Sequence, residues 1–369
     1  PSLGSIRDHK GAVLSVAFHP TAPILATGSQ DNEAKLWRLS DDNQLSDMLL
    51  TAKHDDQIRS VAFHPTEIIL ATGSYDGTAK LWQPSTDSLS LRCVATLQGH
   101  KGAVHSVAFH RSGEFLATGS QDYTVKLWQL SHDRSSASCV ATLDGHTDAV
   151  LSVAFHPSDE FLATGSADKT VKLWRLLPDR SSANCVATLD GHDGYVTSVA
   201  FHPSGNFLAT GSYNTVILRK ISKSDDPDSL SVTLVGTESS AGAVGTVAFH
   251  PLGEFLATGS LDNTVKLWKL SSNDGSPSMS SVAILKMPVP DQSAETKKES
   301  PPPRILSVAF HPTKPILAAG SSDHTATLWD YSIAQKGGRG RKSITRHHKK
   351  RSSRKVKRRV SKTKRYRSK

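Results

Sequence analysis

The chain alternates short apolar runs with polar turns over most of its length. The four letters V-A-F-H return seven times, beginning at Val16, Val61, Val107, Val153, Val199, Val247 and Val308. Neighbouring copies are separated by 45, 46, 46, 46, 48 and 61 residues. A period of this length is typical of repeat architectures, so the pattern predicts seven similar structural units.

Each unit contains four short runs with the composition of β-strands. The order is V-x-S-V-A-F, His-Pro and a polar turn, then F-L-A-T-G-S, an Asp-containing turn and T-V-K-L-W; several copies continue with C-V-A-T-L and Gly-His. Short β-rich runs separated by turn residues predict strands. Four such strands cannot bury their own faces, so the units are expected to pack on one another and to close radially.

Gly-His, Gly-Ser-x-Asp and a terminal Trp recur together at fixed offsets, and in this the chain resembles the WD40-repeat β-propellers. The resemblance covers roughly residues 1–333. It implies an all-β fold, a seven-bladed β-propeller of four-stranded antiparallel blades. Residues 1–334 are predicted to form the propeller, with repeats starting near 9, 54, 100, 146, 192, 240 and 300, and residues 335–369 a disordered tail rich in Lys and Arg.

In four copies a His is followed by Thr after 18 residues, by Asp after 4 more and by Trp after a further 6. The resemblance implies that these four side chains form a buried hydrogen-bonded tetrad inside a blade, a structural device and not a catalytic triad. The four sets are His9, Thr27, Asp31 and Trp37; His54, Thr72, Asp76 and Trp82; His100, Thr118, Asp122 and Trp128; and His146, Thr164, Asp168 and Trp174.

Three copies depart from this pattern. The fifth has Asn214 in place of Asp, a turn that is one residue shorter, and Arg219 in place of Trp. The sixth has Ser240 at the His position, and the seventh has Pro301 and Ala319 at the His and Thr positions. These blades are expected to be less rigid. Arg219 is expected to extend its guanidinium to the surface, with a special contact as the alternative.

The ends of the repeats predict how the ring closes. The seventh copy lacks a V-A-T-L run, while Pro1–Arg7 stands where that run precedes the other Gly-His motifs. The N-terminal segment is therefore predicted to supply the outermost strand of the last blade. Two connections are long, roughly Ile221–Ala243 and Ser271–Arg304. The second is polar and Pro-Ser-rich, which favours a flexible surface loop.

The net charge of +10 divides unevenly along the chain. Residues 336–369 carry 18 Lys and Arg and no Asp or Glu, so the tail is +18 and the remaining body −8. This distribution excludes a uniformly basic nucleic-acid-binding domain. Apolar runs stay far below the ~18 residues of a membrane span, and no secretory signal pattern opens the chain. Cys93, Cys139 and Cys185 are odd in number and widely spaced, which argues against a disulfide framework and favours an intracellular setting.

Histidine, cysteine and serine are the residue types of this chain that could bind a metal ion or act in catalysis. The seven His of V-A-F-H should form a ring on one face, too far apart to share a zinc ion, and are interpreted as repeated turn residues. A pH response of that face below about pH 6.5 is a hypothesis. The cysteines are expected to be buried packing residues. Because no nucleophile elbow, P-loop or H-E-x-x-H occurs, no enzyme activity and no cofactor are predicted.

The resemblance also implies where partners bind, on the face that carries the Gly-His loops and Asp turns. Tyr and Arg most often anchor interfaces, and they vary here while the framework repeats. Arg59, Tyr75, His105 and Gln121 form one candidate patch on the second and third blades, and Tyr195 and Tyr213 another on the fifth. The candidate residues for protein or peptide binding are Gln57, Arg59, Tyr75, His105, Gln121, Tyr195, Tyr213 and Arg304. No small-molecule substrate and no membrane partner are expected.

Two interpretations of the basic tail stay open: a nuclear-import signal, and binding of DNA or RNA through phosphate contacts. The candidate residues for either role are Arg339, Arg341, Lys349, Lys350, Arg351, Arg354, Lys355, Lys357, Arg358 and Arg359. The predicted function is a non-catalytic scaffold for protein interactions. The alternative is a nucleic-acid-associated factor of the chromatin or ribosome-assembly kind, in which the tail is primary. Localisation is predicted to be nuclear or cytoplasmic, with the tail favouring the nucleus.

Overall fold

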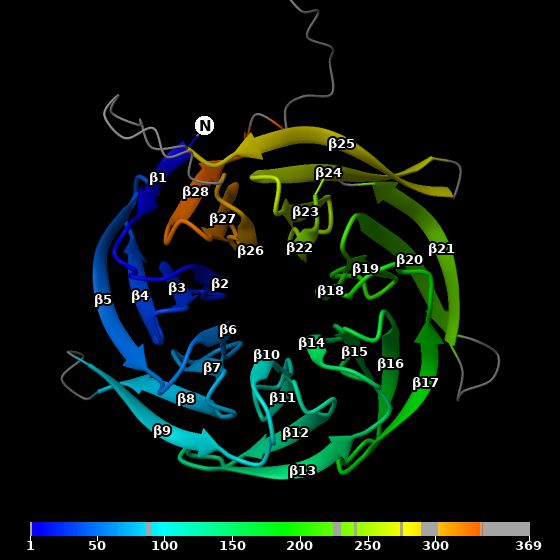
Figure 1. Ribbon diagram of the computed structural model, residues 1–369, viewed down its shortest axis with the longest axis horizontal. Coiled ribbons are helices and arrows are strands. Elements are labelled where there is room, and N and C mark those ends of the chain that lie inside the picture. The colour runs from blue at the N-terminus through cyan, green and yellow to red at the C-terminus, as the bar shows by residue number, and fades with distance from the viewer. Residues whose placement is uncertain are drawn as a thin grey trace, which may run out of the picture.

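The computed structural model describes residues 2–85, 90–223, 230–239, 242–273, 276–288, 302–332 and 334. In that part of the chain, 28 strands form seven four-stranded antiparallel sheets around a central axis (Figure 1). The prediction of an all-β, seven-bladed propeller is confirmed. The candidate residues of the tail, from Arg339 to Arg359, lie outside the described residues. None of the described residues belongs to a helix long and apolar enough to cross a bilayer.

Within blades 1 to 3 the strands follow the chain from the central axis outward. Blade 1 comprises β2 (Val13–Phe18), β3 (Ile24–Ser29), β4 (Glu33–Leu39) and β5 (Leu45–Lys53). Blade 2 comprises β6 (Ile58–Phe63), β7 (Leu70–Ser74), β8 (Ala79–Pro84) and β9 (Leu91–Leu97). Blade 3 comprises β10 (Val104–Phe109), β11 (Phe115–Ser120), β12 (Val125–Leu130) and β13 (Ala137–Leu143).

Blades 4 to 6 repeat this order. Blade 4 comprises β14 (Val150–Phe155), β15 (Phe161–Ser166), β16 (Val171–Leu176) and β17 (Ala183–Leu189). Blade 5 comprises β18 (Ser198–Phe201), β19 (Phe207–Gly211), β20 (Thr215–Lys223) and β21 (Leu230–Ser239). Blade 6 comprises β22 (Val244–Phe249), β23 (Phe255–Ser260), β24 (Thr264–Asn273) and β25 (Ser276–Lys286).

Blade 7 joins the two ends of the described chain. It comprises β26 (Ile305–Phe310), β27 (Ile316–Ser321), β28 (Ala326–Asp330) and, as its outermost strand, β1 (Ser2–Ile6). β1 pairs antiparallel with β28, with Gly4 opposite Leu328 and Ile6 opposite Ala326. The ring therefore closes through the N-terminal strand, as the sequence predicts.

The core lies between blades because each sheet covers the face of the next. Ala26 and Leu36 of blade 1 pack with Ile58 and Val61 of blade 2 in one buried cluster. A Cβ atom at Gly28 of blade 1 would lie only 2.8 Å from side-chain carbons of both Ile58 and Val61. The glycine of F-L-A-T-G-S is thus needed for the close approach of neighbouring sheets, and burial of this apolar surface drives the packing.

A hydroxyl group on each innermost strand links each blade to the next. The backbone N–H of Val61 in blade 2 donates to Oγ of Ser15 in blade 1 at 3.0 Å. The same bond recurs around the ring, from Val107 to Ser60, Val153 to Ser106, Val199 to Ser152, Val247 to Ser198, Val308 to Thr246 and Val16 to Ser307. Every innermost strand thereby both receives and provides one such bond.

The histidines of V-A-F-H also join neighbouring blades. His64 is fully buried, and its Nε2 donates to the carbonyl oxygen of Gly113 in the next blade at 3.1 Å. Its Nδ1 accepts the backbone N–H of Glu67 at 3.1 Å, which requires the neutral imidazole. His156 and His202 bond the next blade in the same way. Burial lowers the pKa of His64, so this histidine gains its proton at a lower pH than a free imidazole does. The pH response of this face stays a prediction, and we expect it at correspondingly lower pH.

The prediction of a flexible loop over Ser271–Arg304 is wrong for residues 276–286, which form β25 and pair with β24. An outermost strand packs on one face only, so it tolerates a polar composition. Ala283 and Leu285 pack against the core, while Val282 and Ile284 are exposed. The connection over Ile221–Ala243 likewise contains the end of β20 and all of β21.

The prediction that the cysteines are buried is also wrong, because Cys93, Cys139 and Cys185 are exposed. Strand alternation alone would turn Cys93 to the same side as Ala95. The ladder, however, pairs Leu81 with Ala95 and then Trp82 with Cys93, so Val94 is an extra residue in a β-bulge. The bulge reverses the alternation and turns the Cys93 side chain outward. The same register shift occurs next to Cys139 and Cys185.

Candidate partner-binding site

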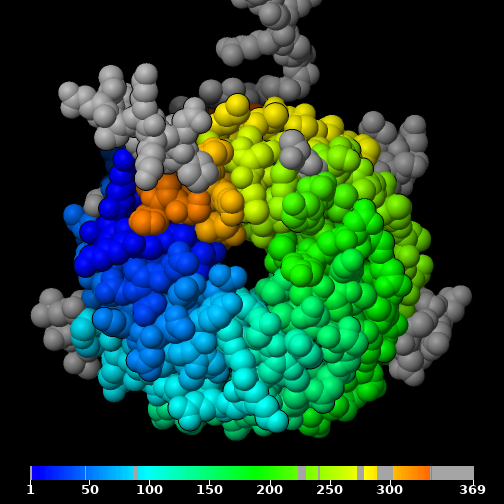
Figure 2. Space-filling model, viewed as in Figure 1, coloured from blue at the N-terminus to red at the C-terminus, as the bar shows by residue number. Residues whose placement is uncertain are grey.

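The propeller has two faces with different loops. One face, called the upper face here, carries the Asp turns between the second and third strands and the loops that lead to the next blade's innermost strand. The His-Pro turns after V-A-F-H lie on the opposite, lower face. Figure 2 shows the opening of the central channel, around which the innermost strands are arranged.

The tetrad of blade 1 is a continuous hydrogen-bonded chain. Trp37 Nε1 donates to Thr27 Oγ1 at 2.9 Å, and the Thr27 hydroxyl lies 2.7 Å from His9 Nε2. His9 Nδ1 donates to Asp31 Oδ2 at 2.8 Å. This direction fits a neutral imidazole whose Nε2 accepts the threonine proton, so each of these polar groups is satisfied.

Blades 2, 3 and 4 contain the same chain of bonds. The His–Asp distances are 2.7, 2.8 and 2.7 Å, and the His–Thr distances are 2.6, 2.7 and 2.7 Å. Burial opposes ionisation of Asp168, but hydrogen bonds from Thr170 and His146 lower the pKa of this carboxyl to about 2. Burial lowers the pKa of His146, although Asp168 opposes that effect. Because the four Thr side chains are fully buried, their hydroxyls are inaccessible to a substrate and bond only within the blade.

Blade 5 replaces the tetrad tryptophan with a buried cation. Arg219 is only 7% exposed, so the prediction that it extends to the surface is wrong. Its Nη1 donates to Thr210 Oγ1 at 3.2 Å, and its Nη2 donates to the Asp190 carbonyl oxygen at 2.6 Å. Arg219 therefore supplies the N–H that Trp supplies elsewhere. Burial and the charge of Arg219 lower the pKa of His192 to about 4.

Blades 6 and 7 keep only parts of the tetrad. In blade 6, Trp268 Nε1 donates to Thr258 Oγ1 at 3.0 Å. In blade 7, Ala319 occupies the threonine position, and the Thr325 hydroxyl bonds Asp323 Oδ1 at 2.6 Å. Ser240 and Pro301, at the histidine positions, lie outside the described residues.

Arg59, Tyr75, His105 and Gln121 form a contiguous set on the upper face, called the Arg59 patch below. The guanidinium carbon of Arg59 lies 5.6 Å from the Tyr75 ring centroid, within the range of a cation–π contact. The Tyr75 and His105 rings meet edge to face, with centroids 5.8 Å apart. His105 Nε2 donates to Gln121 Oε1 at 2.7 Å. Tyr75 is 46% exposed and His105 is buried, so the patch combines an accessible aromatic ring with a fixed base.

The Arg59 patch holds one positive charge without a counter-ion. In the part of the chain that the structure describes, no carboxylate forms an ion pair with Arg59. Burial lowers the pKa of the Arg59 guanidinium, which nevertheless stays charged. Burial also lowers the pKa of His105; the bond to Gln121 opposes this effect, and the charge of Arg59 adds to it. The histidine is therefore neutral at pH 7, and the patch carries a single charge.

Seven residues from the seven blades surround the mouth of the channel. Each occupies the second position of V-x-S-V or of its variants I-x-S-V and V-x-T-V. Together they line a cavity of about 280 Å³: Leu14, Arg59, His105, Leu151, Thr197, Gly245 and Leu306. We call this set the channel ring. Sequence reasoning selected Arg59 and His105 but missed that all seven positions converge, although their shared place in the repeat was the available signal.

The other predicted contact residues do not join the Arg59 patch through side chains. Gln57 is half-buried, and its carbonyl oxygen accepts the backbone N–H of Tyr75 at 2.9 Å. Tyr195 and Tyr213 are 59% and 65% exposed on blade 5, and within the described residues no ring contact joins them. Arg304 is exposed on blade 7, and its N–H donates to Ser322 Oγ at 2.8 Å.

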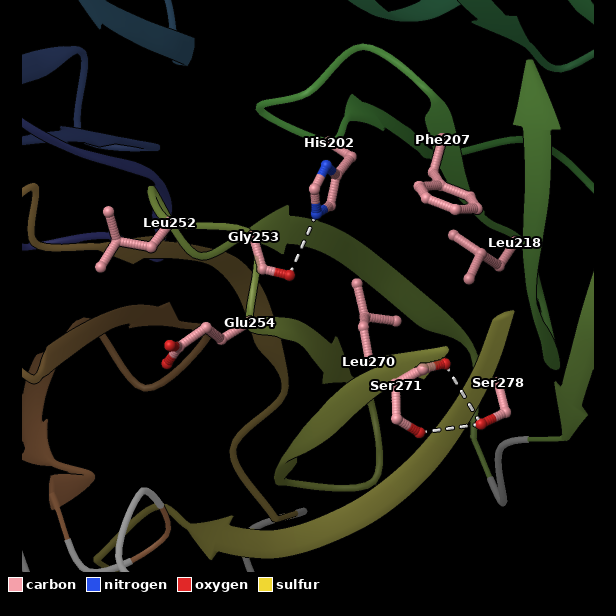
Figure 3. Close-up of a pocket in the computed structure, with 9 residues that line it drawn as sticks. All are labelled: His202, Phe207, Leu218, Leu252, Gly253, Glu254, Leu270, Ser271 and Ser278. Carbon is pink, nitrogen blue, oxygen red and sulfur yellow. Dashed lines mark hydrogen bonds between the residues drawn. The ribbon is translucent and has the colours of Figure 1, made fainter. Parts of the chain in front are cut away.

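A second cavity, of about 290 Å³, lies between blades 5 and 6 (Figure 3). Phe207, Leu218 and Leu270 give it an apolar wall, beside the bond from His202 Nε2 to the Gly253 carbonyl oxygen. The sequence gives no signal for this cavity, because its walls come from framework positions of two repeats. Among the described residues, no three His, Cys, Asp or Glu side chains are grouped closely enough to hold a metal ion.

Comparison with known proteins adds one finding. The profile of the family described as WD40, "WD domain, G-beta repeat", matches residues 1–38, 48–83, 91–129, 137–175, 183–218, 229–269 and 297–330. Each of the first six matches spans the outermost strand of one blade and the inner strands of the next, the seventh spans β26 to β28, and together they cover more than half of the chain. No curated protein matches the chain.

Proposed function

Since the chain belongs to the WD40-repeat family, we propose that it binds protein or peptide partners on its upper face, through the Arg59 patch. Proteins of this family are typically non-catalytic scaffolds for protein interactions. The observation that carries the proposal is the contiguity of Arg59, Tyr75, His105 and Gln121, four residues that differ between repeats whose frame is nearly constant.

The chemistry of the patch suits an interface. Arg and Tyr are enriched among the side chains that dominate binding energy, and they act best where surrounding groups are fixed. Tyr75 contacts both the Arg59 guanidinium and the His105 ring, so little conformational entropy is lost when a partner covers it. The buried threonines and neutral histidines of the tetrads support a structural role for those residues, and we propose that the protein is not an enzyme.

We further propose that the tail binds polyanions or directs nuclear import. The 18 Lys and Arg residues between Lys336 and Lys369, without one acidic residue, favour this role. A nucleic-acid-associated factor in which the tail is primary is the alternative function, supported by the same charge run. Under either proposal the protein is intracellular, and the tail favours the nucleus.

Partner recovery separates these functions. The full-length chain, a variant lacking residues 336–369 and the Arg59→Ala plus Tyr75→Ala variant are immobilised and exposed to cell extract with and without nuclease. We expect a set of proteins that survives nuclease treatment and tail deletion but is lost with the double substitution. Arg92→Ala removes an exposed arginine from outermost strand β9 and is the matched control.

The proposal for the upper face is wrong if the double substitution leaves every recovered partner unchanged. If instead all partners disappear with nuclease or with tail deletion, the tail is primary and the alternative function holds. Binding of RNA or DNA by the tail should weaken by about three decades or more between 50 and 200 mM salt if ~8 phosphates are contacted.

A further inference from the structure

We propose that the mouth of the channel receives one acidic side chain of the partner, a glutamate or aspartate whose carboxylate pairs with Arg59. The inference rests on the proposed function, because it assumes that a partner covers the upper face. It adds the chemical identity of the group that the Arg59 patch recognises and the place where that group enters.

Arg59 carries a positive charge that no acidic side chain of the described residues balances. Arg59 is half-buried at the edge of a cavity of about 280 Å³, and among the described residues no acidic side chain lines that cavity. A guanidinium removed from water without a counter-ion is costly unless a ligand compensates it. A carboxylate matches its planar array of donors and can form two parallel hydrogen bonds.

Contacts within the chain hold the Arg59 side chain in place in the absence of a partner. The guanidinium carbon of Arg59 lies 5.6 Å from the Tyr75 ring centroid, and the His105 ring meets the Tyr75 ring edge to face. His105 is itself fixed by its bond to Gln121. This succession of contacts orients the cation toward the channel mouth at little entropic cost to binding, as expected of a recognition site.

The rest of the channel ring is mostly apolar. Leu14, Leu151 and Leu306 are apolar, and the Thr197 hydroxyl is already used in a bond of 2.6 Å to the Val244 carbonyl oxygen. Gly245 leaves room on the side of the ring across from blades 2 and 3. The ring therefore offers one cation and an apolar wall, which suits the methylene stem and single charge of an acidic side chain.

The same composition disfavours two other occupants. A phosphate group carries nearly two charges and needs several donors, whereas His105 stays neutral and the ring supplies only Arg59. The chain's own tail is +18 and is repelled by a cation at the mouth. A carboxylate from a second protein remains the occupant that balances the site.

The experiment selects peptides from a displayed random library on the immobilised full-length chain. Four proteins are compared: the wild type, Arg59→Gln, Arg59→Glu and the matched control Arg92→Gln. The tail attracts acidic peptides whatever residue stands at position 59, so enrichment is scored as the difference between the wild type and Arg59→Gln. We expect Glu or Asp at one fixed position on the wild type and the control, loss of this preference in Arg59→Gln, and a Lys or Arg preference in Arg59→Glu.

A selected peptide then tests the pairing directly by fluorescence anisotropy. Replacing its acidic residue with Gln, or using Arg59→Gln, should each weaken binding at least tenfold, and the two changes together should weaken it little further. A phosphoserine version of the peptide should bind no more tightly than the acidic one. Thermal unfolding of each variant, measured by circular dichroism, shows that the fold is retained.

The outcomes separate the two proposals. If Tyr75→Ala abolishes peptide binding while Arg59→Gln and the peptide's Gln version bind as before, the upper face binds partners but the acidic-anchor inference is wrong. Tighter binding of the phosphoserine peptide also overturns the inference, in favour of a phosphorylated partner. If no selected peptide depends on Tyr75 or Arg59, both proposals are overturned.

Discussion

Blades 1 to 4 and blades 5 to 7 solve the same packing problem with different interiors. The first four contain complete tetrads, whereas blade 5 uses Arg219, blade 6 retains the Thr258–Trp268 bond, and blade 7 has Ala319 at the threonine position. The sheets nevertheless keep one register: Leu116 pairs with Trp128 in blade 3, as Leu208 pairs with Arg219 in blade 5. The tetrad is therefore not what sets the strand pairing.

What the two halves share is the contact between blades. The hydroxyl bond from one innermost strand to the next is present at all seven junctions, including those of blades 5 to 7. The glycine that permits close sheet approach is also present in every blade. Contacts between blades are therefore common to the whole ring, whereas a complete tetrad is present only in blades 1 to 4.

The largest expected effect comes from removing the residue at the tryptophan position in each half. Trp174→Ala in blade 4 should lower the free energy of unfolding by about 3–5 kcal/mol, because it leaves a cavity and removes the indole N–H that donates to Thr164. Arg219→Ala in blade 5 should cost about 1–3 kcal/mol, because it leaves Thr210 and the Asp190 carbonyl without their donor but also removes a buried charge. Urea unfolding measures both, and an equal cost would contradict the distinction between the halves.

The second effect is a dependence of stability on pH. The pKa of His192 is about 4 in the folded chain against an ordinary 6.5. Between these two pH values His192 is protonated in the unfolded chain and neutral in the folded chain. The free energy of unfolding should therefore fall as the pH drops from 6.5 to 4, by up to about 3 kcal/mol for this group, and be unaffected by it above 6.5. His192→Gln should flatten this slope.

His146→Gln is the comparison in a complete tetrad. Asp168 partly offsets the effect of burial on the pKa of His146. His146→Gln should therefore flatten the dependence of stability on pH less than His192→Gln does. The pKa of the Asp168 carboxyl is about 2 against an ordinary 3.8, so its own contribution to stability declines only below about pH 5, and the two variants are best compared between pH 6.5 and about 5. Urea unfolding at a series of pH values tests the prediction, which fails if the two variants change the slope equally.

The smallest effect concerns a single hydroxyl. Thr72→Val leaves both Trp82 Nε1 and His54 Nε2 without a partner in blade 2, so we expect a loss of about 2 kcal/mol. Thr258→Val in blade 6 leaves one group without its partner among the described residues, Trp268 Nε1, with an expected loss of about 1 kcal/mol. Chemical unfolding of the two variants under one set of conditions gives the difference between their losses of stability. A larger loss for Thr258→Val would contradict the expectation that the threonine of a complete tetrad contributes more.

The repeat makes most of this fold predictable from sequence. V-A-F-H at a nearly constant period indicates the number of blades, and the place of Pro1–Arg7 before His9 indicates the closing strand. These signals survive because a framework position must satisfy the same neighbours in every blade. The polar strand β25 was missed because an outermost strand needs few apolar residues.

The remaining errors arise where three-dimensional context overrides a local rule. Cys93 turns outward because of a bulge at Val94 that alternation does not reveal. Arg219 is buried because Thr210 and the Asp190 carbonyl oxygen accept hydrogen bonds from its guanidinium. The residue types in the sequence do not indicate that these groups meet. The candidate site was partly predictable: Arg59 and Tyr75 vary within a constant frame, but their contact and the convergence of the channel ring depend on how blades pack.

The V-x-S-V run has a consequence for how such a protein evolves. Its serine or threonine holds the neighbouring blade, while the intervening residue lies in the channel ring. A mutation in one codon per repeat can thus alter recognition and leave the inter-blade bonds in place. Gly245 is the constrained case, because a Cβ there would come within 3.0 Å of the Ile305 carbonyl oxygen. Duplication of one repeat copies both the residue that bonds the neighbouring blade and one position that can vary independently at the channel mouth.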